Sequence, residues 1–359
     1  MQKAIPALLM RGGTSKGPFF NAADLPSDTV LRDQVLLAAM GSPDRRQIDG
    51  VGGAHPLTSK VGVVSLSQRE GIDLEFLFVQ VVPDKPLVDT TPNCGNMLAA
   101  VVPFALETGL VQPQGEETTL RVLTLNTDMS ADITVKTPNN QITYQGKTAI
   151  DGVPGNSAPI TINFLDTAGS VCSSLLPTGH EKDVIDGLEV TCIDNGMPMV
   201  LVRAEDVNRT GYESVEQLNQ DTELKTRIES LRLKAGLAMG LGDVSQKTYP
   251  KMCLISKAKQ GGSLSTRCFI PHVCHEALGV LAAVTVATAC VLTHSVAHNI
   301  ATVPSGQIKQ LSIEHPTGEF TVELEVDEKD PQKIIRAALL RTARLIMRGE
   351  VMVSESIWK

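Results

Sequence analysis

A cysteine and a lysine stand in sequences that suit proton transfer, and the cysteine has the more specific setting. Cys94 lies in Asn93-Cys94-Gly95-Asn96, directly before an apolar run that is broken only by Pro103. This pattern predicts a helix with the thiol at its N-terminus, where unpaired amide groups and the helix dipole favour a thiolate. Gly95 and Asn96 allow backbone amides to approach a bound carboxylate or enolate. The alternative is a buried cysteine that only packs, and its polar neighbours favour the functional interpretation.

Lys60 is the second candidate for proton transfer. It follows Leu57-Thr58-Ser59 and opens an apolar segment of strand type. A lysine that enters such a strand can lose its water, and burial favours the neutral amine that acts as a base. The alternative is a surface lysine whose stem lies along a sheet. The residues alone leave both interpretations open.

The segment from Arg11 to Lys16 is typical of a turn that binds an oxyanion. It combines free amides at two glycines, the hydroxyls of Thr14 and Ser15, and a guanidinium group. A glycine hairpin without a ligand is the alternative. The segment lacks the spacing of a nucleotide-binding P-loop.

A second polar cluster precedes the most apolar segment of the chain. It contains Arg267, His272, Cys274 and His275. We interpret it as an anion site rather than a metal site, because ligands on adjacent residues cannot all point at one ion and no fourth ligand is evident. The turn at residues 315–318, which includes Thr317, is a weaker candidate for the same use.

Motifs for several other chemistries are absent from the sequence. It contains no strand–G-x-G-x-x-G–helix pattern, no G-x-S-x-G elbow and no H-E-x-x-H. The sequence therefore contains no motif for hydride transfer, for the use of ATP or for zinc-dependent hydrolysis. A lysine, a cysteine at a helix start and several anion donors together indicate movement of a proton next to a carboxylate.

Composition excludes further classes. The 359 residues favour two domains of about 180 residues each, because single cores stop growing near 250–300 residues. Aromatic residues make up only 3%, which argues against stacking platforms for single-stranded nucleic acid. The formal charge of -8 argues against duplex nucleic acid as a partner.

Cysteine usage and hydropathy indicate the compartment. The seven cysteines show no C-x-x-C pair, so neither a disulfide framework nor a zinc finger is expected. The N-terminus lacks the apolar core of a signal peptide. Residues 277–292 are too few for the ~20 that cross a bilayer, and we interpret them as a central buried helix. We expect a soluble, reduced, cytoplasmic protein with no membrane partner.

The two halves of the chain repeat the same order of segments. Each has an extended segment interrupted by a glycine turn, then a helix, a strand led by a lysine, a very apolar helix preceded by Pro and Cys, and a β-rich end; the pairs are 5–20 and 190–202, 27–40 and 215–239, 60–65 and 251–256, 92–100 and 271–279, and 118–144 and 318–326. A helix that is apolar on all faces must be wrapped by a sheet. We therefore predict two related α+β domains with a shared cleft; two unrelated α+β domains are the alternative.

Eight ordered motifs that span essentially the whole chain resemble those of the PrpF-type isomerase family. They are Met10-Arg11-Gly12-Gly13-Thr14-Ser15-Lys16-Gly17, Ile48-Asp49-Gly50-Val51-Gly52-Gly53, Leu57-Thr58-Ser59-Lys60-Val61, Asn93-Cys94-Gly95-Asn96, Asp151-Gly152-Val153-Pro154-Gly155, Asp194-Asn195-Gly196-Met197-Pro198, Gly242-Asp243-Val244 and Glu314-His315-Pro316-Thr317-Gly318. Within the family they resemble the 4-oxalomesaconate tautomerases and isomerases of gallate and protocatechuate breakdown.

The resemblance implies a fold and an activity. The fold is α+β and diaminopimelate epimerase-like, with pseudo-symmetric domains at residues 1–182 and 183–359, the last strand being free to return to the first domain. The activity is proton transfer on a small unsaturated polycarboxylate, without cofactor or metal. The expected substrate is 4-oxalomesaconate. A 2-methylaconitate cis-trans isomerase and a catalytically silent binder of small acids are the alternatives, and a homodimer stays open.

The resemblance also implies roles for single residues. Lys60 and Cys94 are the expected catalytic pair, and which of them is the base stays open. Cys274 takes the place of a second acid/base cysteine that caps the other central helix in epimerase relatives, and its participation is also open. The expected substrate-binding residues are Arg11, Thr14, Ser15, Ser59, Asn93, Gly95, Asn96, Arg267, His272 and Thr317.

Overall fold

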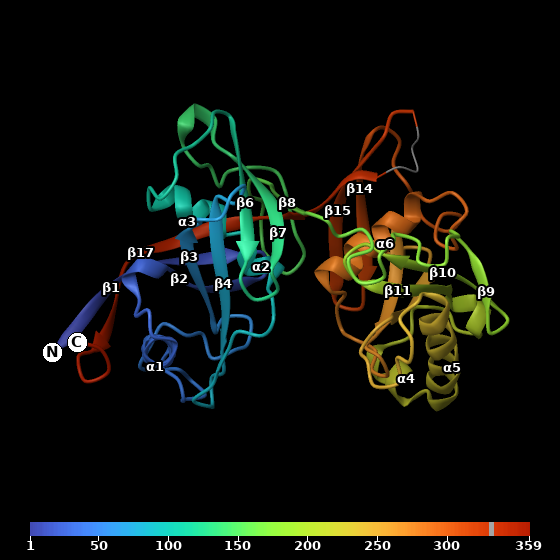
Figure 1. Cartoon of the computed structure of the whole chain (residues 1–359), viewed down its shortest axis with the longest axis horizontal. Helices are drawn as coiled ribbons and strands as arrows, with labels where there is room; N and C mark the ends of the chain where they lie inside the picture. Colours follow the sequence, from blue (N-terminus) through green and yellow to red (C-terminus); the bar gives the residue numbers. More distant parts are fainter. Residues whose placement is uncertain (330–333) are drawn as a thin grey trace. The chain divides into compact units, whose positions relative to one another are not determined.

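The chain packs into two compact units. The computed structural model describes residues 1–329 and 334–359. One unit comprises Met1–Leu165 with Arg341–Lys359, and the other comprises Asp166–Leu340 (Figure 1). Residues 166–182, which the sequence assigned to the first half, pack with the second unit. The last strand of the chain belongs to the first unit.

The first unit is a curved sheet whose strands pair in the order β17–β1–β2–β3–β4–β6–β7–β8, with β5 on β4. The β2–β3 and β4–β6 pairs are parallel and the others are antiparallel. The strands are β1 (Gln2–Gly12), β2 (Ser15–Asn21), β3 (Lys60–Leu66), β4 (Leu74–Val81), β5 (Val88–Asp89), β6 (Glu117–Thr124), β7 (Met129–Lys136), β8 (Ile160–Phe164) and β17 (Ala343–Ser354).

This sheet wraps two short consecutive helices. Helices α2 (Gly95–Leu98) and α3 (Val101–Glu107) contact β1, β2, β3, β4 and β7 (Figure 1). Their side chains are buried from Met97 to Ala105, so an apolar sequence on all faces requires sheet on all sides. The single helix expected after Cys94 is therefore two helices, separated at Ala99 and Ala100.

The outer face of the same sheet is covered by α1 (Thr29–Met40). The Asp28 side chain caps its N-terminus, and Gly41 ends it in the left-handed conformation with φ 77°. The helix contacts β4, β5 and β17 through an apolar stripe that includes Val35 and Leu36. Short 3₁₀ turns at Ala22–Asp24 and Pro138–Asn140 complete the unit.

The second unit has the strand order β9–β10–β11–β12–β13–β14–β15–β16. The β11–β12 and β13–β14 pairs are parallel and the others are antiparallel. The strands are β9 (Asp183–Ile185), β10 (Leu188–Asp194), β11 (Pro198–Arg203), β12 (Lys251–Ser256), β13 (Leu264–Phe269), β14 (Ile308–His315), β15 (Gly318–Val326) and β16 (Ile334–Arg341).

Helix α6 (Val280–Val291) is the wrapped helix of the second unit. It contacts β10, β11, β14 and β15, and its residues from Ala282 to Val291 are all buried. The expected helix at residues 215–239 is instead two helices, α4 (Val215–Gln220) and α5 (Thr222–Ala238), because Asp221 leaves the helical conformation and caps α5. They cover the other face of the sheet and enclose a second apolar core.

The order of parallel and antiparallel pairs from β1 to β8 recurs from β10 to β16. Apolar helices connect the two strands of the second parallel pair in each unit: α2 and α3 lie between β4 and β6, and α6 lies between β13 and β14. Both units are thus α+β, as expected from the sequence.

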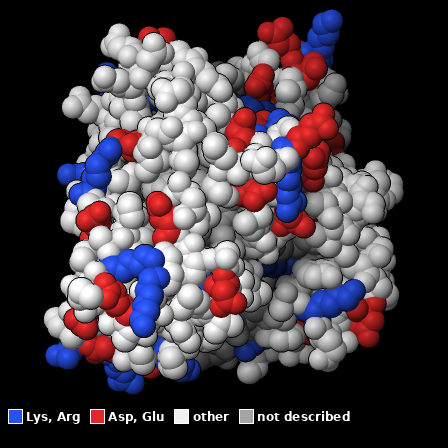
Figure 2. Space-filling model, turned by 60° about the vertical axis from the view of Figure 1, so that its left-hand side comes forward, with Lys and Arg blue, Asp and Glu red and all other residues white. Residues whose placement is uncertain are grey.

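Figure 2 shows acidic and basic side chains interspersed in small groups on one face. Within residues 1–329 and 334–359, no helix combines the length and apolar character that crossing a bilayer requires.

Candidate active site

Three of the motifs meet at one end of the first unit. The turn between β1 and β2, the start of β3 and the start of α2 lie together there. Because β2 and β3 are parallel, their first residues share an edge of the sheet, and the Lys16 amide donates to the Leu57 carbonyl at 3.0 Å. A methyl group on Gly17 would lie 1.7 Å from the Lys60 carbonyl oxygen and 3.4 Å from the Met97 side chain.

The glycine turn is packed directly on Asn96. A methyl group on Gly12 would lie 2.3 Å from the Asn96 carbonyl oxygen, and one on Gly13 would lie 2.1 Å from Asn96 Oδ1. Asn96 Nδ2 donates to Thr14 Oγ1 at 3.0 Å. Only glycine permits this approach, and Gly13 also has φ 51°, which glycine adopts without strain. The contact joins two motifs far apart in the chain.

Cys94 is the N-cap residue of α2, as predicted. Its carbonyl accepts the Leu98 amide at 2.9 Å, and its own amide donates to Asn93 Oδ1 at 2.8 Å. The thiol makes no capping hydrogen bond to the helix and is half-buried. The Cys94 thiol, which the sequence indicated as a candidate, is therefore accessible to a small ligand.

Lys60 is buried, with 8% of its surface exposed, at the first position of β3. Its Nζ donates to Gln80 Oε1 at 2.6 Å and lies 4.8 Å from the centre of the Phe78 ring. Among the described residues, no carboxylate lies within ion-pair distance of this amine. The interpretation as a surface lysine is wrong, because its side chain turns in against β4.

Residues at and just after the end of β6 bond to Phe78, which lies against the lysine, and to the cysteine loop. Asn126 accepts the Phe78 amide at 2.8 Å and donates to the carbonyls of Phe78 and Thr90. Asn93 Nδ2 donates to Thr124 Oγ1 at 3.4 Å and to Thr127 Oγ1 at 3.3 Å. These two bonds hold the Asn93 side chain, whose Oδ1 accepts the Cys94 amide.

Two polar atoms near the turn are buried without a partner. They are Ser15 Oγ and Asn96 Oδ1. A buried hydroxyl without a partner costs free energy, so Ser15 is suited to donate to a ligand oxygen. Ser59 differs, because its Oγ donates to Gln47 Oε1 at 2.6 Å inside the unit.

Arg11 holds the turn rather than pointing freely outward. Its Nη1 donates to the carbonyls of Gly13 at 2.9 Å and Thr342 at 3.1 Å, and to Thr342 Oγ1 at 3.0 Å. Nη2 reaches Ser157 Oγ at 3.4 Å. Burial, and then the nearby charge of Arg344, lower the pKa of Arg11. The guanidinium therefore supports the shape of the glycine turn through Thr342, the residue before β17.

In the second unit, Cys274 does not cap the central helix, and that expectation is wrong. Helix α6 begins at Val280 with Gly279 as its N-cap, whereas Cys274 pairs with Phe269 in an isolated bridge. Asn219 clamps its backbone by accepting from its amide at 2.7 Å. The side chain is 1% exposed in the core under α5, and burial raises the pKa of the Cys274 thiol to about 12.

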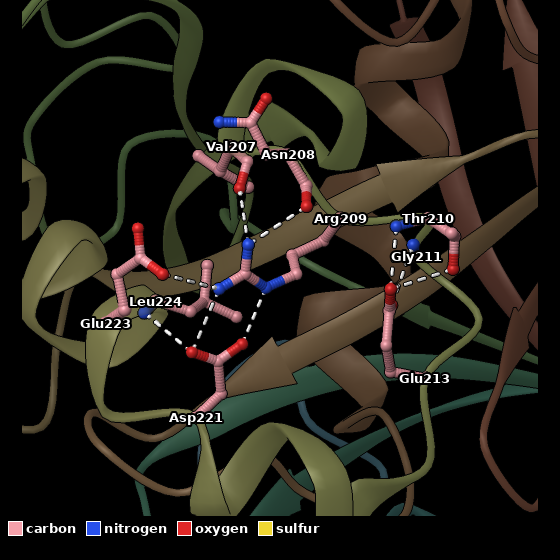
Figure 3. A network of polar contacts seen from close by, with 9 residues as sticks. All are labelled: Val207, Asn208, Arg209, Thr210, Gly211, Glu213, Asp221, Glu223 and Leu224. Atoms are coloured by element: carbon pink, nitrogen blue, oxygen red, sulfur yellow. Dashed lines mark hydrogen bonds and ion pairs between the residues drawn. The ribbon is translucent and has the colours of Figure 1, made fainter.

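Arg267 lies on β13 and contacts the polar network of residues 207–224 through Glu213 alone among the bonds described. Arg209 lies between the Asp221 carboxylate, 2.6 Å from its Nε, and two backbone carbonyls (Figure 3). The Glu213 side chain accepts the amides of Thr210 and Gly211 (Figure 3), and its carbonyl accepts Arg267 Nε at 2.9 Å. Burial lowers the pKa of Arg267.

The other predicted residues of this unit have separate partners. His272 Nδ1 lies 3.5 Å from Glu229 on α5, and Thr317 Oγ1 donates to the Glu276 carbonyl at 2.8 Å. The latter bond ties the β14–β15 turn to the loop before α6. In the part of the chain that the structure describes, no three His, Cys, Asp or Glu side chains form a group that could hold a metal ion.

Sequence reasoning missed Gln80, Gln47 and Asn126. All three are amides that hold backbone or side-chain groups around Lys60 and the Cys94 loop. Gln80 could be found only from the antiparallel register that places it opposite Lys60, and that register is not evident from the two segments.

Comparison with known proteins confirms the family. The model of the PrpF protein family matches residues 2–354. A 4-oxalomesaconate tautomerase of Pseudomonas putida is 52% identical over 99% of this chain and 98% of its own length. A (4E)-oxalomesaconate Delta-isomerase of Novosphingobium sp. is 55% identical over 97% of both chains. The chain belongs to the PrpF family.

A solved structure shows the same fold. The crystal structure of a methylitaconate-delta-isomerase superimposes with a TM-score of 0.86 and 32% identity, covering 99% of this chain and 97% of the other. Like these relatives, the protein is an isomerase.

Proposed function

We propose that this protein moves a proton within an unsaturated oxo-polycarboxylate, and that 4-oxalomesaconate is its substrate. The observation that carries the proposal is the Lys60 amine, which is buried, hydrogen-bonded to an uncharged amide and placed at the same end of the unit as Cys94. The 52% and 55% identity to enzymes named for 4-oxalomesaconate supports this substrate. The structure named for methylitaconate is only 32% identical, which makes a smaller acid the less favoured choice.

The reaction needs two groups that exchange protons with the substrate. One removes a proton from the carbon that lies between an unsaturated or carbonyl group and a carboxylate, and the C–H electrons delocalise into a dienolate. The other returns a proton to the γ-carbon or to the oxygen, so the product has the same atoms as the substrate. We assign these steps to Lys60 as base and Cys94 as acid; the reverse order uses the same two groups.

Substrate binding is proposed for the donors around the glycine turn. Ser15 Oγ lacks a protein partner, and the Gly95 and Asn96 amides begin α2, where a developing negative charge is stabilised. Thr14 and Asn93 orient these donors through their bonds to Asn96 and Cys94. Ser59 and Arg11 act by holding the loop before β3 and the glycine turn in place, since their polar atoms already have partners.

We propose that the second unit arose as a duplicate of the first and that the chain therefore has a diaminopimelate epimerase-like fold. The recurring order of strand pairs supports this proposal. Arg267 and His272 remain proposed contacts for carboxylates, and Thr317, whose hydroxyl already donates to the Glu276 carbonyl, is proposed to hold the β14–β15 turn beside them. Cys274 is not proposed as a proton carrier, because its thiol is buried and its pKa is raised to about 12.

A proton NMR experiment tests the function. Purified protein, dialysed against EDTA, is mixed with 4-oxalomesaconate in D2O, and the signals are compared with those of a sample without protein. We expect faster conversion to an isomer, with deuterium from the solvent at the carbon that receives the proton. Calorimetric binding of the acid without conversion would support the silent binder, and conversion of 2-methylaconitate alone would support the cis-trans isomerase.

A further inference from the structure

The side-chain amide of Gln80 has only one orientation that satisfies its neighbours. Its Nε2 donates to the Ser59 carbonyl at 2.9 Å and to the Pro56 carbonyl at 3.2 Å. A carbonyl oxygen can only accept, so the NH2 end must face these two groups. The Oε1 end therefore faces Lys60, which donates to it at 2.6 Å.

The backbone around Gln80 is equally well defined. Lys60 and Gln80 are direct partners in the antiparallel β3–β4 pair, and β5 pairs with the other side of β4. The loop that supplies the two carbonyls is held by Gln47, whose Oε1 accepts from Ser59 Oγ at 2.6 Å and from the Ala54 amide at 2.8 Å. The loop that binds the Gln80 amide is therefore itself fixed by hydrogen bonds.

Gln80 is uncharged, and this affects how easily the neighbouring Lys60 amine can gain and lose a proton. A carboxylate at this position would form an ion pair and stabilise the ammonium form. A neutral amide oxygen accepts a hydrogen bond from an amine as well as from an ammonium group. The Phe78 ring, 4.8 Å from Nζ, is the other group against the amine.

The titratable groups on neighbouring elements are engaged elsewhere. Asp89, opposite Gln80 on β5, accepts the Thr91 amide at 2.8 Å, and that bond lowers the pKa of Asp89. His55, in the turn before β3, accepts the Leu57 amide at 3.1 Å through Nδ1. Neither forms a contact with Lys60 among the described residues.

We propose that Gln80 is a positioning residue, which holds Lys60 Nζ toward the substrate while leaving the amine free to gain and lose a proton. This inference rests on the proposed function, since it assigns Gln80 a role in the same proton transfer. It explains why an uncharged residue stands where an acidic one would bind a lysine more tightly.

The test compares two substitutions of Gln80 with a matched control. Gln80→Met removes the acceptor, and we expect kcat to fall about 10- to 100-fold with little change in KM, because misplacement of a reacting group by about 1 Å costs this much. Gln80→Glu adds a carboxylate of the same size, and the limb of the kcat/KM pH profile that belongs to Lys60 should move at least about one pH unit toward alkaline. Gln141→Glu adds the same charge at an exposed position and should leave the profile unchanged.

A readout without substrate separates this inference from the proposed function. The ¹³Cε signal of Lys60, assigned by its loss in Lys60→Met, is titrated in protein labelled at lysine. We expect the midpoint in Gln80→Glu to be higher than in the unsubstituted protein. An unchanged midpoint, or full activity of Gln80→Met while Lys60→Met is inactive, would overturn the inference and leave the function standing. A shifted midpoint in Gln80→Glu, together with no isomerase activity of the unsubstituted protein, would overturn the proposed function and leave standing only the electrostatic contact between Gln80 and Lys60.

Discussion

The two proposed proton carriers are held in different ways. Lys60 is enclosed, with Gln80 as the acceptor for its amine and Phe78 against it. Cys94 has its backbone fixed by the start of α2, while its thiol makes no cap bond and is half-buried. Enclosure suits a base that must lose water to be neutral, and access suits a thiol that meets the substrate.

Thiol chemistry distinguishes Cys94 from Cys274. At pH 8 we expect iodoacetamide to modify Cys94 and to leave Cys274 unmodified, because Cys274 is 1% exposed and its pKa is raised to about 12. Peptide mapping by mass spectrometry measures both sites, and Cys94→Ser serves as the control. We also expect Cys274→Ala to keep activity within about threefold, since the thiol lies outside the proposed proton path. Equal modification of both cysteines in the folded protein would refute this assignment.

At the scale of elements, the site depends on the contact between the β1–β2 turn and α2. A side chain at Gly12 would meet the Asn96 backbone and one at Gly13 would meet the Asn96 side chain, so either would disturb the start of the helix. Arg11 fixes the same turn to Thr342, next to β17. The position of Cys94 is therefore set by a strand from each end of the chain.

Substitution of Gly13 by alanine tests this contact. Both Gly13 and Gly71 have positive φ, at 51° and 73°, so alanine at either should cost about 1–2 kcal/mol of stability. Only at Gly13 does the new methyl group meet Asn96, whereas Gly71 has nothing within 4 Å. We expect Gly13→Ala to lower kcat/KM at least about tenfold and Gly71→Ala to leave it unchanged. Equal kinetics of the two variants, at matched stability, would show that the turn does not position the site.

The sequence predicted these elements where local chemistry determines them. The Cys94 helix start and the strand after Lys60 follow from turn residues and apolar runs, which are local signals. The role of Gln80 and the burial of Lys60 depend on strand register, which is a long-range property. The prediction that Cys274 caps the central helix was wrong because the apolar segment does not reveal that this helix begins only at Val280.

At the scale of the whole molecule, each unit buries an apolar helical segment inside a sheet, two helices in the first unit and one in the second, and the second unit also buries several thiols. Cys192, Cys274 and Cys290 are buried, and burial raises the pKa of each to about 12 from a reference of 9.0. The apolar core of that unit thus includes groups that ionise readily only after unfolding.

This burial predicts a loss of stability in alkali. Above about pH 9 the unfolded chain releases thiol protons that the folded chain retains up to about pH 12, so the free energy of unfolding falls with rising pH in this window. Urea unfolding between pH 7.5 and 10.5 measures the slope. We expect a shallower fall in Cys290→Ala, which lacks one such thiol. The same slope in both proteins would contradict the contribution of Cys290.

The central claim is that Lys60 and Cys94 carry the proton in separate steps, and deuterium exchange tests it most directly. 4-Oxalomesaconate is incubated in D2O with the unsubstituted protein, Lys60→Met and Cys94→Ser, and proton NMR follows both exchange and isomerisation. We expect the first to do both, Lys60→Met to do neither, with a loss of at least about 10²–10⁴-fold, and Cys94→Ser to exchange hydrogen without isomerising. Exchange by Lys60→Met but not by Cys94→Ser would reverse the two roles, and near-normal turnover by both variants would contradict the site.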